Sequence, residues 1–152
     1  MAGNREKYLS YSEAWRRIDS AIAAGFYFEA VTLQESIIAD RLLSFIKGVE
    51  PTCKVKANTN FGELIKNWRR LAGTLPHDDA GTDLGSRVEA WRSRRNEVVH
   101  GLVKSAPGEP TQSVDAFIEG CQATAVSGRG LAREVLAWHQ RQLRSLRTKG
   151  AV

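Results

Sequence analysis

Apolar residues recur every three or four positions along most of this chain, and no stretch alternates apolar and polar residues as a β-strand does. Between Phe26 and Lys47 the apolar residues cover more than one narrow face of the helix that this spacing predicts. We therefore expect a central helix over residues 26–47 that packs against other elements on two sides. Its apolar positions are Val31, Leu33, Ile37, Ile38, Leu42, Phe45 and Ile46.

Glycine, proline and capping residues divide the rest of the chain into further helices. The expected ranges are about 10–24, 61–71, 82–103 and 112–143, with a clear break at 106–110 and a weakened stretch at 127–130. This pattern predicts one all-α domain over residues 1–152, an up-down bundle of five or six helices. Its basic end, from about residue 129 to residue 152, is the part that such a bundle can leave flexible.

Composition restricts the class of protein further. With 152 residues, 42% hydrophobic and 26% charged, the chain is long enough to bury a core and is typical of a soluble globular domain. Its N-terminus is polar, unlike a signal peptide, and no apolar run is long enough to span a membrane. Cys53 and Cys121 lie far apart and match no metal-binding spacing. We expect a cytoplasmic protein with no membrane partner, no metal and no cofactor.

The charge balance is a weak indication of a polyanionic partner. Lys and Arg number 22 against 17 Asp and Glu, a net charge of +5. Part of the excess lies near the C-terminus, where six basic residues from Arg129 to Lys149 accompany a single acidic one, Glu134. Such a run is usually a solvated helix face, and its other interpretation is a surface that binds RNA.

Near the end of the fourth expected helix stands the segment Arg95-Asn96-Glu97-Val98-Val99-His100. On a helical wheel Arg95 falls within the apolar face, where an unpaired guanidinium is costly to bury. It must therefore reach water, meet a carboxylate or point into a cleft. Asn96 and His100, four residues apart, share another side. The apolar face consists of Leu84, Val88, Trp91, Val98 and Leu102.

This segment resembles the R-x(4–6)-H motif of the HEPN superfamily, in its form R-N-x-x-x-H. The segment Phe61-Gly-Glu-Leu-Ile-Lys-Asn-Trp68 is similar to one that is frequent in such domains, and the likeness in helix order spans nearly the whole chain. The resemblance implies a metal-independent endoribonuclease in which Arg95 and His100 are catalytic and Asn96 is the polar residue beside the arginine. The 2′-OH of RNA would attack the adjacent phosphate and leave a 2′,3′-cyclic phosphate.

Members of this family act as two-fold homodimers with both motifs facing one cleft, and they include toxins of toxin–antitoxin and phage-defence systems. The resemblance therefore implies RNA as substrate, a second copy of the chain, and an antitoxin or other restraining protein as partners. One subgroup carries a tyrosine two residues after the histidine, which a nucleotidyltransferase modifies. This chain has Leu102 there, so control by that route is not expected.

Several residues near the motif have two interpretations. Arg92 and Arg94 flank it and are expected to contact RNA phosphates or to be surface charges. Glu35, Asp40 and Arg41 interrupt an apolar helix and are expected to form ion pairs within or between helices. Their other interpretation is that they pair with Arg95 or line the cleft. The remaining histidines, His77 and His139, are expected at the surface. The tryptophans are expected in the core: Trp15, Trp68, Trp91 and Trp138.

Two other functions stay open at this point. One is a HEPN-like module without enzymatic activity that binds a nucleotide, RNA or a protein. The other is a helical adaptor or antitoxin-like protein that dimerises through its central helix.

Overall fold

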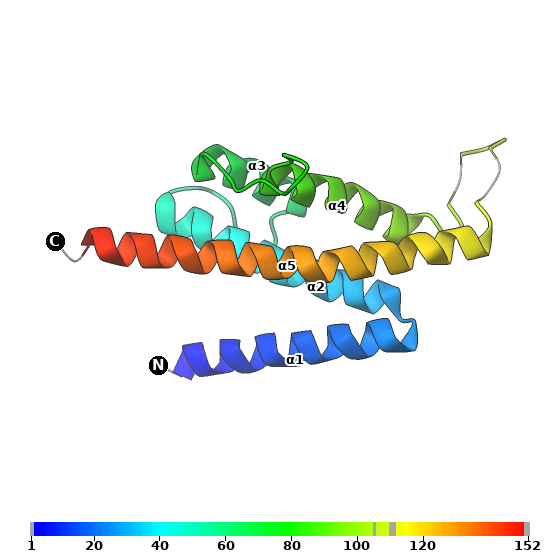
Figure 1. Cartoon of the computed structure of the whole chain (residues 1–152), viewed down its shortest axis with the longest axis horizontal. Coiled ribbons are helices and arrows are strands. Elements are labelled where there is room, and N and C mark those ends of the chain that lie inside the picture. The colour runs from blue at the N-terminus through cyan, green and yellow to red at the C-terminus, as the bar shows by residue number, and fades with distance from the viewer. Residues whose placement is uncertain (1, 105, 110–111, 151–152) are drawn as a thin grey trace.

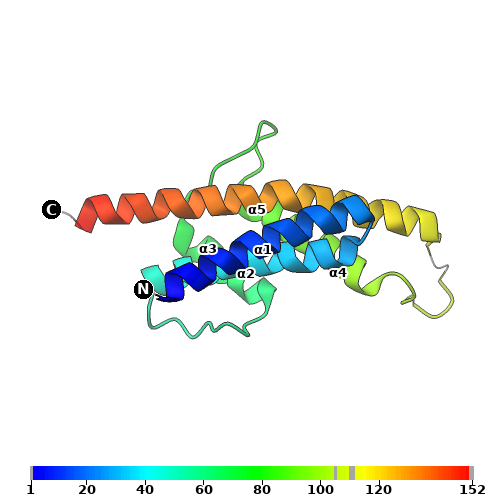
Figure 2. The same cartoon turned by 90° about the horizontal axis from the view of Figure 1, so that it is seen from below.

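The computed structural model describes residues 2–104, 106–109 and 112–150, and it confirms the all-α class. Within these residues the chain forms five helices and no strand, only an isolated β-bridge between His77 and Asp83. The helices are α1 (Ala2–Ala24), α2 (Tyr27–Val49), α3 (Phe61–Ala72), α4 (Leu84–His100) and α5 (Val114–Gly150). Figure 1 shows α5 running along the length of the molecule, with α1 on one side of it and α3 and α4 on the other. The two ends of the chain lie at the same end of the bundle (Figures 1 and 2).

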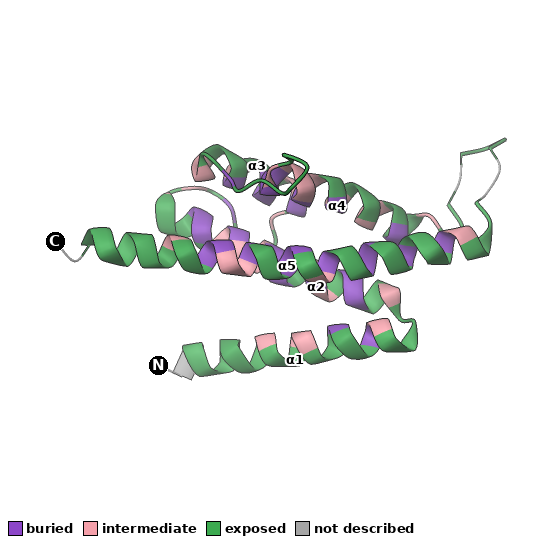
Figure 3. Ribbon diagram, in the orientation of Figure 1, coloured by how far each residue is buried: buried purple, intermediate pink, exposed green. Residues whose placement is uncertain are grey.

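The central helix α2 packs against neighbours on more than one side, as its apolar pattern predicts. It forms the middle of the core between α1, α3 and α5, and its buried positions cover about half of the helix circumference. Figure 3 shows the buried residues of the bundle in purple. Aromatic side chains fill the space around it: the Trp138 ring lies edge-on to Phe45 and Trp68, with centroids 4.8 and 5.6 Å apart. The buried residues of α2 are Ala30, Val31, Gln34, Ile37, Ile38, Leu42, Phe45 and Ile46.

Local signals explain where three helices begin or end. Gly25, with φ of 81°, makes the turn between α1 and α2. Asn60 caps α3 by accepting from the Glu63 amide at 2.9 Å. Asp83 caps α4 by accepting from the Ser86 amide at 2.8 Å. The start of α1 was expected near Ser10, but the helix begins at Ala2, eight residues earlier.

The prediction of a weakened stretch at residues 127–130 is wrong, because α5 is continuous from Val114 to Gly150. Gly128 is a point of close approach and not a helix breaker. A Cβ there would lie 2.1 Å from Gln34 Oε1 on α2 and 2.7 Å from Trp91 Nε1 on α4, so no larger residue fits. Residues 151 and 152 of the expected flexible end lie outside the described residues, as do residues 105, 110 and 111 of the connection between α4 and α5.

Two expected positions are also wrong. Leu102 was expected on the buried face of the fourth helix, but α4 ends at His100 and the Leu102 side chain is exposed. His139 was expected at the surface, but it is buried on α5, and its Nδ1 atom has no hydrogen-bond partner among the described residues. Among the described residues, no helix is long and apolar enough to span a membrane.

Candidate functional site

Arg95 meets a carboxylate, as the cost of burying a guanidinium demands. The side chain projects from α4 toward α2, where its Nε and Nη2 atoms donate to the two carboxylate oxygens of Glu35. Its Nη1 donates to Oδ1 of Asn96 at 2.6 Å. The Arg95 and Glu35 side chains keep 23% and 19% of their surfaces exposed, so the ion pair lies at the edge of the core.

This pairing fixes the guanidinium while leaving part of it available. An arginine has five N–H groups, and Glu35 and Asn96 account for three of them. Among the described residues no further acceptor meets Arg95, so one N–H on each of its terminal nitrogens is available to a ligand. Because the fork geometry of arginine matches the oxygens of a phosphate, these groups can bind a phosphodiester beside the Glu35 pair.

His100 is the last residue of α4, and its side chain is exposed to solvent. Five residues separate it from Arg95, which is a rotation of about 140° around the helix axis. The imidazole and the guanidinium therefore leave the helix on different sides. One chain does not bring these two predicted catalytic groups together.

The third predicted catalytic residue, Asn96, contacts Arg95. Its Oδ1 atom accepts from Arg95 Nη1 and so helps to orient the guanidinium. Asn96 shares the His100 side of the helix, four residues away, so it lies between the two predicted catalytic groups.

The two flanking arginines occupy different environments. Arg92 donates to Glu89 at 3.0 Å and lies against α3, where a Cβ at Gly62 would come 2.8 Å from its Nη2 atom. That makes Arg92 part of the contact between α3 and α4. Arg94 is exposed and lines two hollows between α4 and α5, of about 160 Å³ and about 560 Å³. Of the two, Arg94 is the one whose side chain is exposed to solvent.

Apolar side chains surround the exposed end of α4. Val99, next to His100, is 48% exposed and Val103 is 85% exposed. Gly101 packs against the buried Phe117 ring at the start of α5, and the exposed Phe28 ring of α2 lies 6.2 Å from that ring. Exposed apolar residues that gather beside a candidate site are typical of a surface that another molecule covers.

Glu35 pairs with Arg95, which was one of the interpretations that the sequence left open for it. A carboxylate within an apolar helix stretch indicates a partner, but periodicity cannot say which cation it meets. Asp40 and Arg41 pair with each other, so they form the ion pair that was one of their two interpretations. Among the described residues, no three His, Cys, Asp or Glu side chains group together as a metal site would require.

A comparison of the chain with protein-family models, with curated proteins and with solved structures finds no match in any of the three.

Proposed function

We propose that this protein is a HEPN-type endoribonuclease that cleaves RNA without a metal ion and acts as a homodimer. The observation that carries the proposal is the state of Arg95. A partly buried guanidinium, held by Glu35 and Asn96 with two N–H groups left over, stands five residues before an exposed histidine. The R-N-x-x-x-H order of these residues resembles that of the HEPN family.

In this mechanism the 2′-oxygen of RNA attacks the adjacent phosphorus, and the bond from phosphorus to the 5′-oxygen of the next nucleotide breaks. His100 takes the proton from the 2′-OH or gives one to the leaving 5′-oxygen. Arg95 stabilises the negative charge that develops on the phosphorane oxygens. The products are a 2′,3′-cyclic phosphate and a free 5′-OH, and DNA is not cleaved because it lacks the 2′-OH.

A second copy of the chain supplies what one chain lacks. Because Arg95 and His100 point to different sides of α4, the His100 of one subunit acts with the Arg95 of the other across a two-fold axis. The exposed apolar residues around the end of α4, among them Val99 and Val103, support a contact between subunits at this end.

The test incubates the purified protein with labelled RNA in the presence of EDTA. We expect cleavage with 2′,3′-cyclic ends, and a loss of about 10² to 10⁴-fold in rate for His100→Ala, because general acid–base catalysis contributes that much. Arg95→Ala should cost about 10² to 10³-fold through the lost charge stabilisation. His77→Ala, which changes an exposed histidine near the start of α4, is the matched control and should cleave at the rate of the unmodified protein.

Cleavage that requires Mg²⁺, or an unchanged rate in His100→Ala, would contradict this proposal. The alternative is then a HEPN-like module that binds RNA or a nucleotide without cleaving it. One observation favours that alternative: at the last position of α4, a histidine interacts favourably with the helix dipole without any catalytic role.

The proposal extends to a toxin or phage-defence effector that an antitoxin or another protein restrains. Expression of the unmodified chain should then arrest cell growth, whereas His100→Ala at the same level should not. Equal growth of the two strains would remove the toxin role and leave the nuclease to be judged by the cleavage assay.

A further inference from the structure

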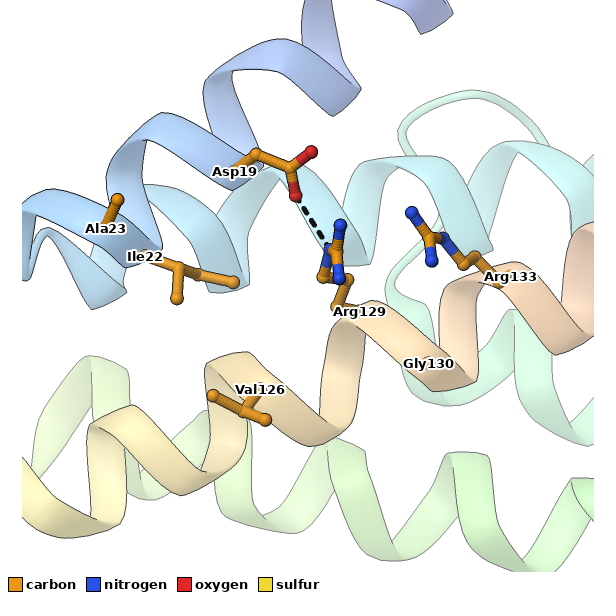
Figure 4. Close-up of a pocket in the computed structure, with 7 residues that line it drawn as sticks. All are labelled: Asp19, Ile22, Ala23, Val126, Arg129, Gly130 and Arg133. Atoms are coloured by element: carbon orange, nitrogen blue, oxygen red, sulfur yellow. Dashed lines mark hydrogen bonds and ion pairs between the residues drawn. The ribbon is translucent and has the colours of Figure 1, made fainter.

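A groove of about 530 Å³ lies between α1 and α5 (Figure 4), and neither Arg95 nor Glu35 lines it. Its α1 wall contains Asp19 and Ile22, and its α5 wall contains Arg129 and Arg133, which both project toward α1 in Figure 4. Between these two arginines the α5 wall is Gly130, where a Cβ would meet nothing within 4 Å. The groove is therefore open and has cations on one side.

Arg129 and Arg133 each contact a residue of α1, and these contacts use only part of their hydrogen-bonding capacity. Arg129 Nε donates to Asp19 at 2.7 Å, in an ion pair whose side chains are 40% and 51% exposed. Arg133 lies over the ring of Trp15 at 5.5 Å, and among the described residues it has no carboxylate partner. Arg133 thus presents a free cationic fork at the groove.

The cationic wall continues along α5 beyond the groove. Arg144 follows Arg133 by eleven residues and Arg147 follows Arg129 by eighteen, which are about three and five whole turns. All four arginines therefore lie along one side of the helix over about 27 Å. From Val135 to Gly150 the sequence has no Asp or Glu that could neutralise them.

The α1 wall supplies aromatic rings. Trp15 is partly buried beneath Arg133, and Tyr8, two turns earlier on the same side of α1, is 71% exposed. A cationic wall opposite aromatic rings is how proteins hold single-stranded nucleic acids, because phosphates pair with the cations while the faces of unpaired bases stack. In a duplex the base faces are stacked on one another and cannot stack on these aromatic rings.

We propose that the α1/α5 groove, together with Arg144 and Arg147, binds single-stranded RNA, with phosphates on the arginines and a base on the aromatic wall. That the nucleic acid is RNA rests on the proposed function. Binding itself needs neither His100 nor cleavage, so it is measured separately. The groove holds the strand on a side of the molecule different from that of Arg95, and so gives the chain a second contact with its substrate.

The experiment measures fluorescence anisotropy of a labelled, unstructured RNA of about 12 nucleotides, within the range that single-strand binding sites cover. All proteins carry His100→Ala so that the RNA stays intact. Arg144→Glu is compared with Lys66→Glu, which makes the same charge change on an exposed lysine of α3. We expect Arg144→Glu to raise the Kd about tenfold and to reduce the salt dependence of binding, whereas Lys66→Glu changes the Kd less than about twofold.

Two further variants test the groove itself. Arg133→Glu should weaken binding at least as much as Arg144→Glu, and Arg133→Lys should restore most of it because it keeps the charge. Trp15→Leu should raise the Kd about tenfold through the lost stacking. Arg144 lies beyond His139, the last buried residue of α5, so its replacement leaves the core intact. The Arg144→Glu measurement therefore tests the proposal even if the Trp15 variant folds poorly.

If Arg144→Glu and Arg133→Glu bind as tightly as Lys66→Glu with the same salt dependence, the groove proposal is wrong. That result leaves RNA cleavage by the unmodified protein untouched. Conversely, a protein that binds RNA through these residues but cleaves none removes the nuclease proposal and keeps the groove.

Discussion

Two carboxylates on α2 make contrasting ion-pair sites. Glu35 and Asp40 stand five residues apart, about 140° around the helix, so they face different neighbours. Glu35 meets one cation, Arg95 of α4. Asp40 accepts from three side chains: Lys7 at 2.9 Å and Tyr11, both on α1, and its neighbour Arg41.

The two sites therefore differ in their hydrogen bonds. Asp40 accepts from several donors and links α1 to α2, whereas Glu35 accepts from part of the Arg95 guanidinium only. Burial alone would raise the pKa of Asp40, but hydrogen bonds from Tyr11, Lys7 and Arg41 outweigh it and hold that pKa below its ordinary value. Burial and the bond to Asp40 raise the pKa of Tyr11. The Asp40 group thus joins α1 to α2, while the Glu35 group fixes a guanidinium that keeps two N–H groups for a ligand.

Between the Glu35 and Asp40 sites, the largest expected effect is on cleavage and comes from Glu35. Glu35→Ala frees the Arg95 side chain and should lower kcat about 10²-fold, because a misplacement of about 1 Å costs that much. Glu35→Gln keeps an oxygen acceptor for Arg95 and should retain much more activity.

The matched control is Asp40→Asn, which changes the second carboxylate of this comparison and should cleave RNA within about twofold of the unmodified rate. If Asp40→Asn lost as much activity as Glu35→Ala, the distinction between the two sites would fail.

A second effect, on stability, should have the opposite pattern. Asp40→Ala leaves three donors without their shared acceptor and should lower the free energy of unfolding by about 1–3 kcal/mol. Urea unfolding followed by circular dichroism measures this value. Lys7→Ala removes only an exposed donor of the same group and should cost less than about 1 kcal/mol. A loss below about 1 kcal/mol in Asp40→Ala would show that Asp40 does not join α1 to α2.

The smallest effect is a pH dependence that belongs to the Asp40 side of the bundle. Burial of His139, with Arg41 nearby, lowers its pKa below the ordinary value of 6.5; Asp40 opposes this shift and Lys7 adds to it. The unfolded chain then binds a proton near pH 6.5 that the folded chain resists. Stability should therefore fall as the pH drops below about 6.5, by at most about 1.4 kcal/mol per pH unit for one proton.

His139→Gln should flatten this dependence between about pH 6.5 and the lower folded-state pKa, whereas His77→Gln, an exposed position, should leave it as it is. Melting temperatures measured across this range decide between them. An unchanged slope in His139→Gln would place the titration elsewhere.

Helical periodicity predicted the class of fold and the central position of α2, because apolar spacing reports burial directly. It failed where a residue acts through a neighbour far along the chain. Gly128 looks like a helix breaker in isolation, yet it is required by Gln34, ninety-four positions earlier. His139 was expected at the surface because the sequence shows no matched partner for it, although it lies on the buried side of α5.

The candidate site divides in the same way. The motif residues Arg95, Asn96 and His100 could be selected from sequence because their order along one helix is itself the signal. The pairing of Arg95 with Glu35 joins residues sixty positions apart, and its choice over Asp40 depends on which side of α2 faces α4. Glu35 and Asp40 differ by a rotation of about 140° around α2, and the local sequence does not show which of the two faces α4.

The contact at Gly128 has a mechanical consequence for Arg95. Gln34 of α2 donates to the carbonyl of Ala125 at 2.7 Å, and Trp91 of α4 donates to that of Thr124 at 3.0 Å, so both helices are tied to the same turn of α5. Glu35 directly follows the first donor, and Arg95 lies one turn beyond the second. Because α2 and α4 are both bonded to α5 here, the Arg95 guanidinium needs little rearrangement when an anion binds beside it. Such preorganised donors stabilise negative charge that develops in a transition state.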